Sequence, residues 1–557
     1  MQKRFLSVLA ASVFAVFLFS SCSKTNKQGR YIPVKAGAVF HINGKSINEK
    51  LSWDEIKQNE AFKEMSSDSS VPAYAKVILN NPDSSGLDIK NDIEIFVVKD
   101  STGAYAGVEG FVKDKTKFKQ FLGNAHKDAK ETSKDGYTYL TDMHASIAYN
   151  DERFFTAINL PQLANMGKMP SMDMPTDSAF GSINEIKYDR DMAGVAASLI
   201  SLKEGESLAK DDHFTELMKT TGDVHMFYNA QYFNAAGNLG AMSAMVNMDK
   251  LTNGAQATAT VNFDNGKINI DLKSYGSKEL TELMKKYSGD SFDKNMVKNI
   301  PSKNLAGMFA LNFKPEGLKE FLKLMNLDGL ANIGLAQLGI TLDDFVNANK
   351  GDILFAVTDI RKDSIAPPTA TYVFSASIAD KNAFNKLIDA GKKAGGPMMG
   401  NTVSSNIAFN TNDKYFVLSN NKDASDTYLA GTANNSFPFL DNISGGPMGG
   451  YVNFQYIMNS MKPTDSIGIL THDASIKMWD NMLISGGNFS DGGIKQHWEI
   501  NLVDKNTNSL KQLNTYAGIM SAIEKKKKEK DEAMWRSEDV INPAFKDTTT
   551  IAVPGTK

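Results

Sequence analysis

The order of apolar and polar positions predicts a mixed α+β chain. Apolar runs at 92–98 and 352–357 have the length of buried strands. Asp114 and Asp380 each precede apolar residues at helical spacing, which is the pattern of a helix that begins at a capping aspartate. We therefore expect an α+β fold of antiparallel-sheet units with helices packed on one face.

These motifs occur twice in the same order. An Ile-Pro-x-Lys sequence opens each series, and an Asn-Gly or Asp-Gly hairpin signal ends each series. The matched segments are 32–43 with 300–312, 92–98 with 352–357, 114–122 with 380–388, 147–150 with 407–410, 229–232 with 453–456 and 262–266 with 488–492. Their conserved order predicts a tandem duplication of the α+β unit, because chance matches would not keep one order.

The expected organisation has five parts. Residues 1–21 are a lipoprotein signal peptide, 22–30 a polar tether, 31–290 the first half of the duplication and 298–520 the second half. Residues 521–557 are expected to form a charged helical and then disordered tail.

Composition narrows the classes of function. The 557-residue chain is 42% hydrophobic and has a net charge of -3, so it can bury several cores and shows no basic footprint for nucleic acid. Acidic residues flank the basic run Lys525–Lys528 and interleave with Lys530, from Glu524 to Glu532, which is typical of a solvated helix. The single cysteine excludes intramolecular disulfides and cysteine-pair zinc sites.

That cysteine, Cys22, follows a segment made for export. Lys3 and Arg4 precede an apolar stretch from Phe5 to Phe19, which is too short to be a typical membrane span. Two serines then lead into Cys22, as in a bacterial lipobox, whose cysteine carries diacylglycerol and a further acyl chain such as palmitate. An uncleaved anchor helix, or an ordinary signal peptide with an incidental cysteine, is the alternative.

The sequence after Cys22 bears on location. No acidic residue occurs from Lys24 to Arg30, whereas surface lipoproteins of Bacteroidetes tend to carry them there. We therefore expect a protein anchored in the outer membrane through its N-terminal lipid and facing the periplasm.

The lipobox, the Ile-Pro-x-Lys strand, the Asn-Pro-x-x-x-Gly turn (Asn81, Pro82, Gly86) and the repeated α+β units resemble the Bacteroidetes lipoproteins grouped as domain-of-unknown-function family 4836. The resemblance covers nearly the whole mature chain. It implies a structural framework and no assigned activity.

Motifs for catalysis and metal binding are weak. Gly44-Lys45-Ser46 lacks the earlier glycine of a phosphate-binding loop, and no Gly-x-Ser-x-Gly or His-Glu-x-x-His motif occurs. The histidines are dispersed at positions 41, 126, 144, 213, 225, 472 and 497. Residues 81–92 resemble a calcium loop but place Asp92 where a bidentate Glu is required, so a proline-containing turn is preferred. We predict no cofactor and no catalytic residue.

One cluster suits a soft metal. Met166, Met169, Met172 and Met174 lie in a proline-containing stretch, and thioethers can bind Cu(I). The chain is rich in methionine throughout, with 26 residues, so ordinary packing is the preferred interpretation.

Two functional hypotheses follow. The first is a non-catalytic, lipid-anchored envelope protein that binds or scaffolds a protein, glycan or lipid ligand. The second is an enzyme that processes envelope glycan or peptide through dispersed carboxylates, since catalytic pairs need not be adjacent in sequence.

Overall fold

The computed structural model describes residues 28–541, except 69–70, 72, 89, 101–102, 161–189, 233–245, 363–366 and 403–406. Cys22 and the four clustered methionines therefore lie outside the described residues. None of the helices in the described ranges combines the length and hydropathy that a membrane crossing requires.

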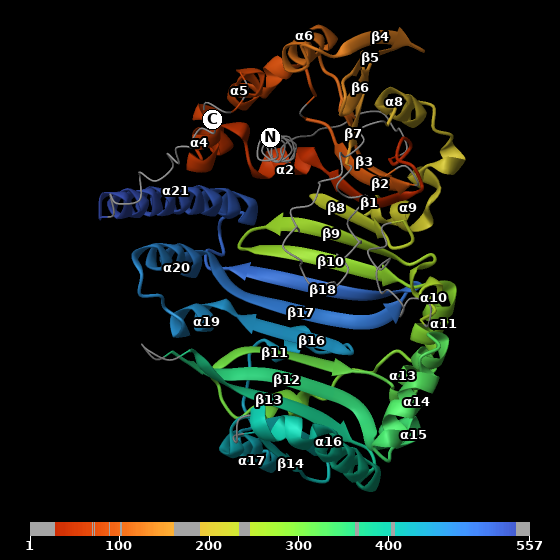
Figure 1. The fold of residues 1–557 in the computed structure, drawn as a ribbon, viewed down its shortest axis with the longest axis vertical. Helices are drawn as coiled ribbons and strands as arrows, with labels where there is room; N and C mark the ends of the chain where they lie inside the picture. The colour runs from red at the N-terminus through yellow and green to blue at the C-terminus, as the bar shows by residue number, and fades with distance from the viewer. Residues whose placement is uncertain are drawn as a thin grey trace, which may run out of the picture.

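The described strands form one sheet of 18 members (Figure 1). The strands are β1 (Ala36–Ile42), β2 (Ile93–Asp100), β3 (Gly103–Phe111), β4 (Lys130–Lys134), β5 (Tyr137–Thr141), β6 (Ala145–Tyr149), β7 (Arg153–Asn159), β8 (Val224–Asn229), β9 (Gln256–Asp264), β10 (Lys267–Tyr275), β11 (Leu305–Asn312), β12 (Asn349–Arg361), β13 (Thr369–Ile378), β14 (Ala408–Thr411), β15 (Tyr415–Ser419), β16 (Met448–Asn453), β17 (Trp479–Ser490) and β18 (Gly493–Leu502).

The helices flank this sheet. The α-helices are α2 (Gly44–Lys50), α3 (Trp53–Lys57), α4 (Glu60–Ser67), α5 (Ala73–Asn80), α6 (Lys115–Ala125), α8 (Met192–Ile200), α9 (Asp212–Leu217), α10 (Asp249–Thr252), α11 (Lys278–Lys286), α12 (Lys294–Lys298), α13 (Pro315–Leu324), α14 (Asp328–Gln337), α15 (Leu342–Ala348), α16 (Lys381–Thr402), α17 (Lys422–Ala430), α18 (Leu440–Ile443), α19 (Phe454–Ser460), α20 (Ser466–Met478) and α21 (Ser509–Ile541). Short 3-10 turns are η1 (Pro82–Ser85), η2 (Glu204–Glu206) and η3 (Leu208–Lys210).

Antiparallel pairing links all of these strands and confirms the predicted α+β class. The order across the sheet is β4–β5–β6–β7–β3–β2–β1–β8–β9–β10–β18–β17–β16–β11–β12–β13–β15–β14. Pairing of β10 with β18 joins the two halves of the chain at the middle of the sheet.

The two halves repeat one strand order. The sequence β7–β3–β2–β1–β8–β9–β10 has its counterpart in β15–β13–β12–β11–β16–β17–β18. A register shift between Ala36 and Ala38 recurs between Leu305 and Gly307 at the corresponding strand pairs. These features accord with a tandem duplication.

One matched pair requires correction. The sequence comparison paired Asn150 with Asn410, but the turns align Asn150 with Asn412. The side chain of Asn150 accepts a hydrogen bond from the Arg153 backbone N at 2.8 Å, and Asn412 accepts one from the Tyr415 backbone N at 2.8 Å. Turn geometry is the better guide here, because an Asn side chain that binds backbone two or three residues ahead defines the turn.

The helices pack on both faces of the sheet, so the prediction of one covered face is wrong. Phe154 and Phe155 are neighbours on β7 and point to opposite faces, as strand geometry requires. Phe155 is buried on the face that α8 and α9 cover. Phe154 lies on the opposite face and packs against the cluster to which α6 contributes. The second half repeats this arrangement, with α12, α17 and α18 over one face and α16 over the other.

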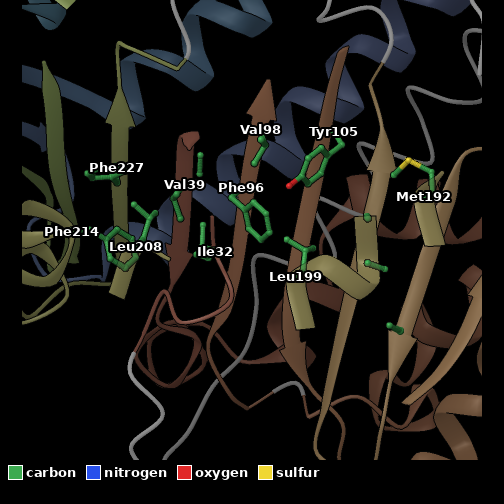
Figure 2. Close-up of a cluster of buried hydrophobic side chains, with 14 of the residues drawn as sticks. Ile32, Val39, Phe96, Val98, Tyr105, Met192, Leu199, Leu208, Phe214 and Phe227 are labelled. Carbon is green, nitrogen blue, oxygen red and sulfur yellow. The ribbon is translucent and has the colours of Figure 1, made fainter. Parts of the chain in front are cut away.

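A cluster beneath α8 and α9 forms the main core of the first half. Figure 2 shows Val39 and Phe96 on neighbouring strands with Phe214 and Leu199 from the helices among them. Ile32, which follows the predicted tether, is fully buried in the same cluster. The first described residues of the chain are thereby fixed to the sheet.

Candidate functional site

A groove of about 800 Å³ lies between helices from the two ends of the chain. In Figure 1, α4, α21 and α20 lie together at one end of the strands. The lining residues are Leu51, Glu55, Gln58, Asn59, Glu60, Leu470, Asp473, Ala474, Lys477, Lys511, Asn514, Thr515, Gly518, Ile519, Ala522, Ile523 and Lys526. This volume falls within the roughly 300–1,000 Å³ of small-molecule sites.

Two pairs of residues hold the groove walls together. Ser52 and Glu55 form a capping box that begins α3, and Asn59 caps α4. The Asn59 amide donates to the Asn514 side-chain oxygen at 2.9 Å, and Lys511 Nζ lies 2.6 Å from Glu55 Oε1. These contacts join segments about 455 residues apart, so the groove exists only in the folded chain.

Four apolar side chains of the lining, Leu51, Leu470, Ile519 and Ile523, are here called the floor of the groove. Leu51 and Ile523 are buried, while Leu470 and Ile519 expose 38% and 45% of their surface. Gly518 brings α21 close to α4, because a Cβ at this position would lie 2.9 Å from Asn59 Oδ1. An apolar ligand would remove the exposed leucine and isoleucine surface from water.

The charged side chains of the lining, here called the rim, are of two kinds, those with an ion-pair or hydrogen-bond partner and those without one. The hydrogen bond from Lys511 lowers the pKa of Glu55 to about 2, so this pair is ionised and internally neutral. The Asp473 carboxylate lies within hydrogen-bond distance of the His472 ring, at 3.1 Å, and Glu60 forms an ion pair with Lys63 at 2.6 Å.

Two lysines of the rim differ from the other charged groups. Within the described residues, the ammonium groups of Lys477 and Lys526 form no ion pair and donate no hydrogen bond. They present two ammonium groups to a groove that the Glu60 and Asp473 carboxylates also line, beside its apolar floor. This combination suits a ligand that has an apolar chain and an anionic end.

A second unusual feature is a buried row of ionisable residues in the first half. Glu109, Glu94, His41 and His225 lie opposite one another across β3, β2, β1 and β8, so they project to one face. The ring Nδ1 atoms of His41 and His225 are 3.0 Å apart. Arg153 of β7 donates to Glu109 Oε1 at 2.9 Å.

Burial controls the ionisation of this row. It raises the pKa of Glu94 well above its usual value, and the nearby Glu109 adds to that rise. Burial raises the pKa of Glu109 to about 7, although Arg153 opposes the rise. Burial lowers the pKa of His225 to about 4, so this ring is neutral at pH 7.

The second half builds the same sheet without this row. At the positions of His41, His225, Glu94 and Glu109, the second half has Ala310, Gly449, Leu354 and Ser375. Ala310 lies opposite Gly449 and Leu354, and Leu354 also lies opposite Ser375. Tyr415 occupies the position of Arg153, since both follow an equivalent asparagine turn. The fold therefore does not require the ionisable row.

The row contacts the segment that follows the predicted tether. The Gly29 backbone N donates a hydrogen bond to Glu94, and Arg30 stabilises the ionised form of Glu109. The Tyr31 ring lies 4.9 Å from Phe155 and 5.4 Å from the Arg153 guanidinium. The ionisable row thus fastens residues 29–31 to the sheet.

The histidines predicted to be dispersed do not assemble a metal site in the described part of the chain, where no group of three or more suitable His, Cys, Asp or Glu side chains occurs. His497 Nδ1 lies 2.8 Å from Asp271, and Ser485 is its partner on β17.

Two other motifs have structural roles. Gly44-Lys45-Ser46 forms the first turn of α2, with Asn43 as its cap. Residues 82–85 form the turn η1, in agreement with the preferred interpretation of that segment. Gly86 has a φ of 76°, and a Cβ there would lie 2.3 Å from the Asp114 carbonyl oxygen. This position requires glycine.

Sequence comparison identifies the family. A family model described as a domain of unknown function, DUF4836, matches residues 29–168 and 192–430. The chain belongs to the DUF4836 family. No curated protein matches this chain. Two crystal structures of TP0453, forms IV and I, are similar to this chain at 10% sequence identity. Each match covers 44% of this chain, and the two matches cover 80% and 78% of the TP0453 chains. The TM-scores are 0.25 and 0.24.

Proposed function

We propose that this DUF4836 protein is a lipid-anchored, non-catalytic binding protein of the cell envelope, whose groove holds an anionic amphiphile. The acyl chain would lie on the floor formed by Leu470 and Ile519, and the acidic head would lie near Lys477 and Lys526. The observation that carries the proposal is the pairing of an exposed apolar floor with two lysines that have no acidic partner in the described structure.

The energetics favour this class of ligand. Each methylene group removed from water contributes about 0.8 kcal/mol, so a long chain supplies most of the affinity. The lysines add a smaller term, because both remain at a solvated rim. Of the carboxylates in the lining, Glu55 and Glu60 are held in ion pairs with Lys511 and Lys63.

The proposed location follows from the N-terminal sequence. Cys22 would carry diacylglycerol and a further acyl chain such as palmitate, and the protein would face the periplasm from the outer membrane, as in Bacteroidetes lipoproteins. More than one acyl chain is needed for stable anchoring.

Titration of the full-length protein with palmitate tests the proposal. The double variant Lys477→Ala/Lys526→Ala should bind palmitate about tenfold more weakly, which corresponds to about 1.4 kcal/mol. Hexadecanol lacks the carboxylate, and its affinity should be the same for both proteins. Ile519→Asp should weaken both ligands, because it places a charge on the floor.

The matched control is Lys525→Ala/Lys527→Ala. These lysines lie on the same helix but do not line the groove. Equal loss of palmitate binding in this control would show that general charge, and not the groove, attracts the ligand. Absence of saturable palmitate binding to the parent protein would refute the proposal.

A further inference from the structure

The two outer strands of the sheet, β4 and β14, differ in charge. β4 has the sequence Lys-Glu-Thr-Ser-Lys, and all five of its residues are exposed. β14 has the sequence Ala-Phe-Asn-Thr and carries no charge. Figure 1 places these strands at opposite ends of the molecule. Charged side chains on an outer strand oppose pairing with another chain, so β4 is protected from such pairing and β14 is not.

The first half shows what covers an edge of this kind. β6 is the counterpart of β14, because Asn150 and Asn412 form equivalent turns at their ends. β5 pairs with β6 and places Leu140 opposite Ile147, and both of these side chains are buried. Within the described residues, β14 pairs with β15 alone. An antiparallel strand therefore fits the place that is open beside β14.

The chain between α16 and β14 is too short to supply that strand. Residues 126–144 join α6 to β6 and contain both β4 and β5. The equivalent connection in the second half is residues 403–407. A hairpin of two five-residue strands and a turn does not fit into this length. A strand beside β14 has to come from elsewhere.

The open edge exposes apolar side chains. Phe409 has the position of Ile147, but Phe409 exposes 41% of its surface and Ile147 exposes 7%. Ile407, two residues before Phe409 and therefore on the same face, is 40% exposed. The cluster beneath α16 is built on β12, β13 and β15 and contains no described residue of β14. An added strand would remove Ile407 and Phe409 from water.

The backbone of β14 offers hydrogen-bonding groups to the open side. The Asn412 backbone N donates to the Tyr415 carbonyl oxygen at 3.0 Å, so the backbone groups of Asn412 face β15. Successive residues of a strand direct these groups to alternate sides. The groups of Asn410 therefore face β15, and those of Phe409 and Thr411 face away from it.

The charged groups that contact β14 in the described structure are paired. Lys392 Nζ lies 5.6 Å from the Phe409 ring centroid and 3.3 Å from Asp389. Asp426, which accepts a hydrogen bond from the Asn410 side chain at 3.0 Å, forms an ion pair with Lys422. Like charges that meet across two strands are destabilising. Two copies of this edge avoid that repulsion.

We propose that β14 pairs antiparallel with β14 of a second copy of this chain about a two-fold axis. Phe409 lies opposite the partner's Phe409, and Ile407 lies opposite the partner's Thr411. An antiparallel pair of identical strands is self-complementary, because each outward N–H meets an outward carbonyl of the copy. The pairing rests neither on the ligand of the groove nor on the lipid anchor.

The variant Thr411→Pro tests the pairing. Proline removes an N–H that faces the open side and leaves the β14–β15 hydrogen bonds intact, as outer strands tolerate. Light scattering of the purified full chain in detergent should show the protein mass doubling as concentration rises. Because the two-fold axis removes the bond twice, Thr411→Pro should raise the dissociation constant about tenfold.

Ser133→Pro on β4 is the matched control. The Asp142 backbone N donates to the Ala145 carbonyl oxygen, so Asp142 faces β6 and Tyr139 faces β4. Thr132 lies opposite Tyr139, and Ser133 therefore directs its N–H outward. The control should keep the dissociation constant of the parent.

Phe409→Lys provides a second test if Thr411→Pro has a lower melting temperature than the parent. It places two like charges opposite each other in the pair and should also raise the dissociation constant about tenfold or more.

Three outcomes overturn the inference. The first is a parent protein that stays monomeric up to about 100 µM, since weaker pairing has no use in a cell envelope. The second is a dimer that both Thr411→Pro and Phe409→Lys leave unchanged, because another surface then forms it. The third is a monomer that holds a different polypeptide and loses it in Thr411→Pro, because the strand beside β14 then comes from another protein.

Discussion

His41 of β1 lies opposite His225 of β8, with their Nδ1 atoms 3.0 Å apart, whereas the equivalent pair in the second half is Ala310 opposite Gly449. Two buried rings this close cannot both carry a proton without strong repulsion. The pair therefore makes the first half sensitive to acid in a way that the second half is not.

Acid should destabilise the first half through His225. Its folded-state pKa of about 4 lies below the ordinary value of 6.5, so the unfolded chain binds the proton more tightly. The free energy of unfolding should fall by about 3 kcal/mol as pH drops from about 6.5 through 4. His225→Asn should remove most of this dependence in thermal denaturation at successive pH values. An unchanged pH profile would contradict the assignment.

Glu109 should produce the opposite trend. Its folded-state pKa of about 7 exceeds the ordinary 4.5, so ionisation costs the folded state more. Its stabilising contribution is complete below about pH 4.5 and is lost as pH rises through 7. Glu109→Gln should remove this fall, about 3 kcal/mol, in the free energy of unfolding between pH 4.5 and pH 8, measured by denaturation at the two pH values. The exposed Glu152→Gln is the control, and equal effects of the two changes would rule out burial as the cause.

The corrected turn alignment predicts a contrast between two nearby asparagines. Asn412→Ala removes a side chain that accepts from the Lys414 and Tyr415 backbone N atoms, at a cost of about 1 kcal/mol. Asn410→Ala loses one exposed hydrogen bond to Asp426 and should cost little. Amide hydrogen exchange at β14 and β15 measures the difference. Equal effects at the two positions would favour the alignment based on residue identity.

Lipid attachment has its own test. Cys22→Ala should abolish labelling with palmitate and move the protein from the membrane fraction to the soluble fraction or leave the precursor unprocessed. The folded halves should keep the melting temperature of the parent, because their buried clusters are built from Ile32 onward. Palmitate labelling that persists in the variant would contradict attachment at this cysteine.

Local patterns predicted the elements well. Asp114 and Asp380 cap α6 and α16 as expected, because each accepts a hydrogen bond from the backbone N three residues ahead. The Asn-Gly and Asp-Gly signals lie at the β9–β10 and β17–β18 hairpins. Helix caps and hairpin turns depend on a few adjacent residues, so the local sequence is enough to predict them.

Burial on both faces also has a signal in the sequence. Residues 95–98 and 353–357 are apolar without alternation, which indicates strands covered on both sides. Ile353 and Leu354 accordingly join different clusters on opposite faces.

The groove could not be predicted from local pattern. Its walls meet through Asn59 and Asn514, which are 455 positions apart, and neither residue has neighbours that signal a site. Lys477 and Lys526 resemble many other surface lysines in sequence. Their significance comes from the apolar floor that tertiary packing places beside them.

Photochemical crosslinking with a palmitate analogue that carries a diazirine at the chain end tests the central claim most directly. Mass spectrometry of the full-length protein should locate the adducts in peptides from α20 and α21 that contain Leu470 and Ile519. Excess palmitate should suppress these adducts, and Ile519→Asp should greatly reduce them. Saturable adducts confined to other elements, with none on α20 or α21, would contradict the assignment of the groove as the binding site.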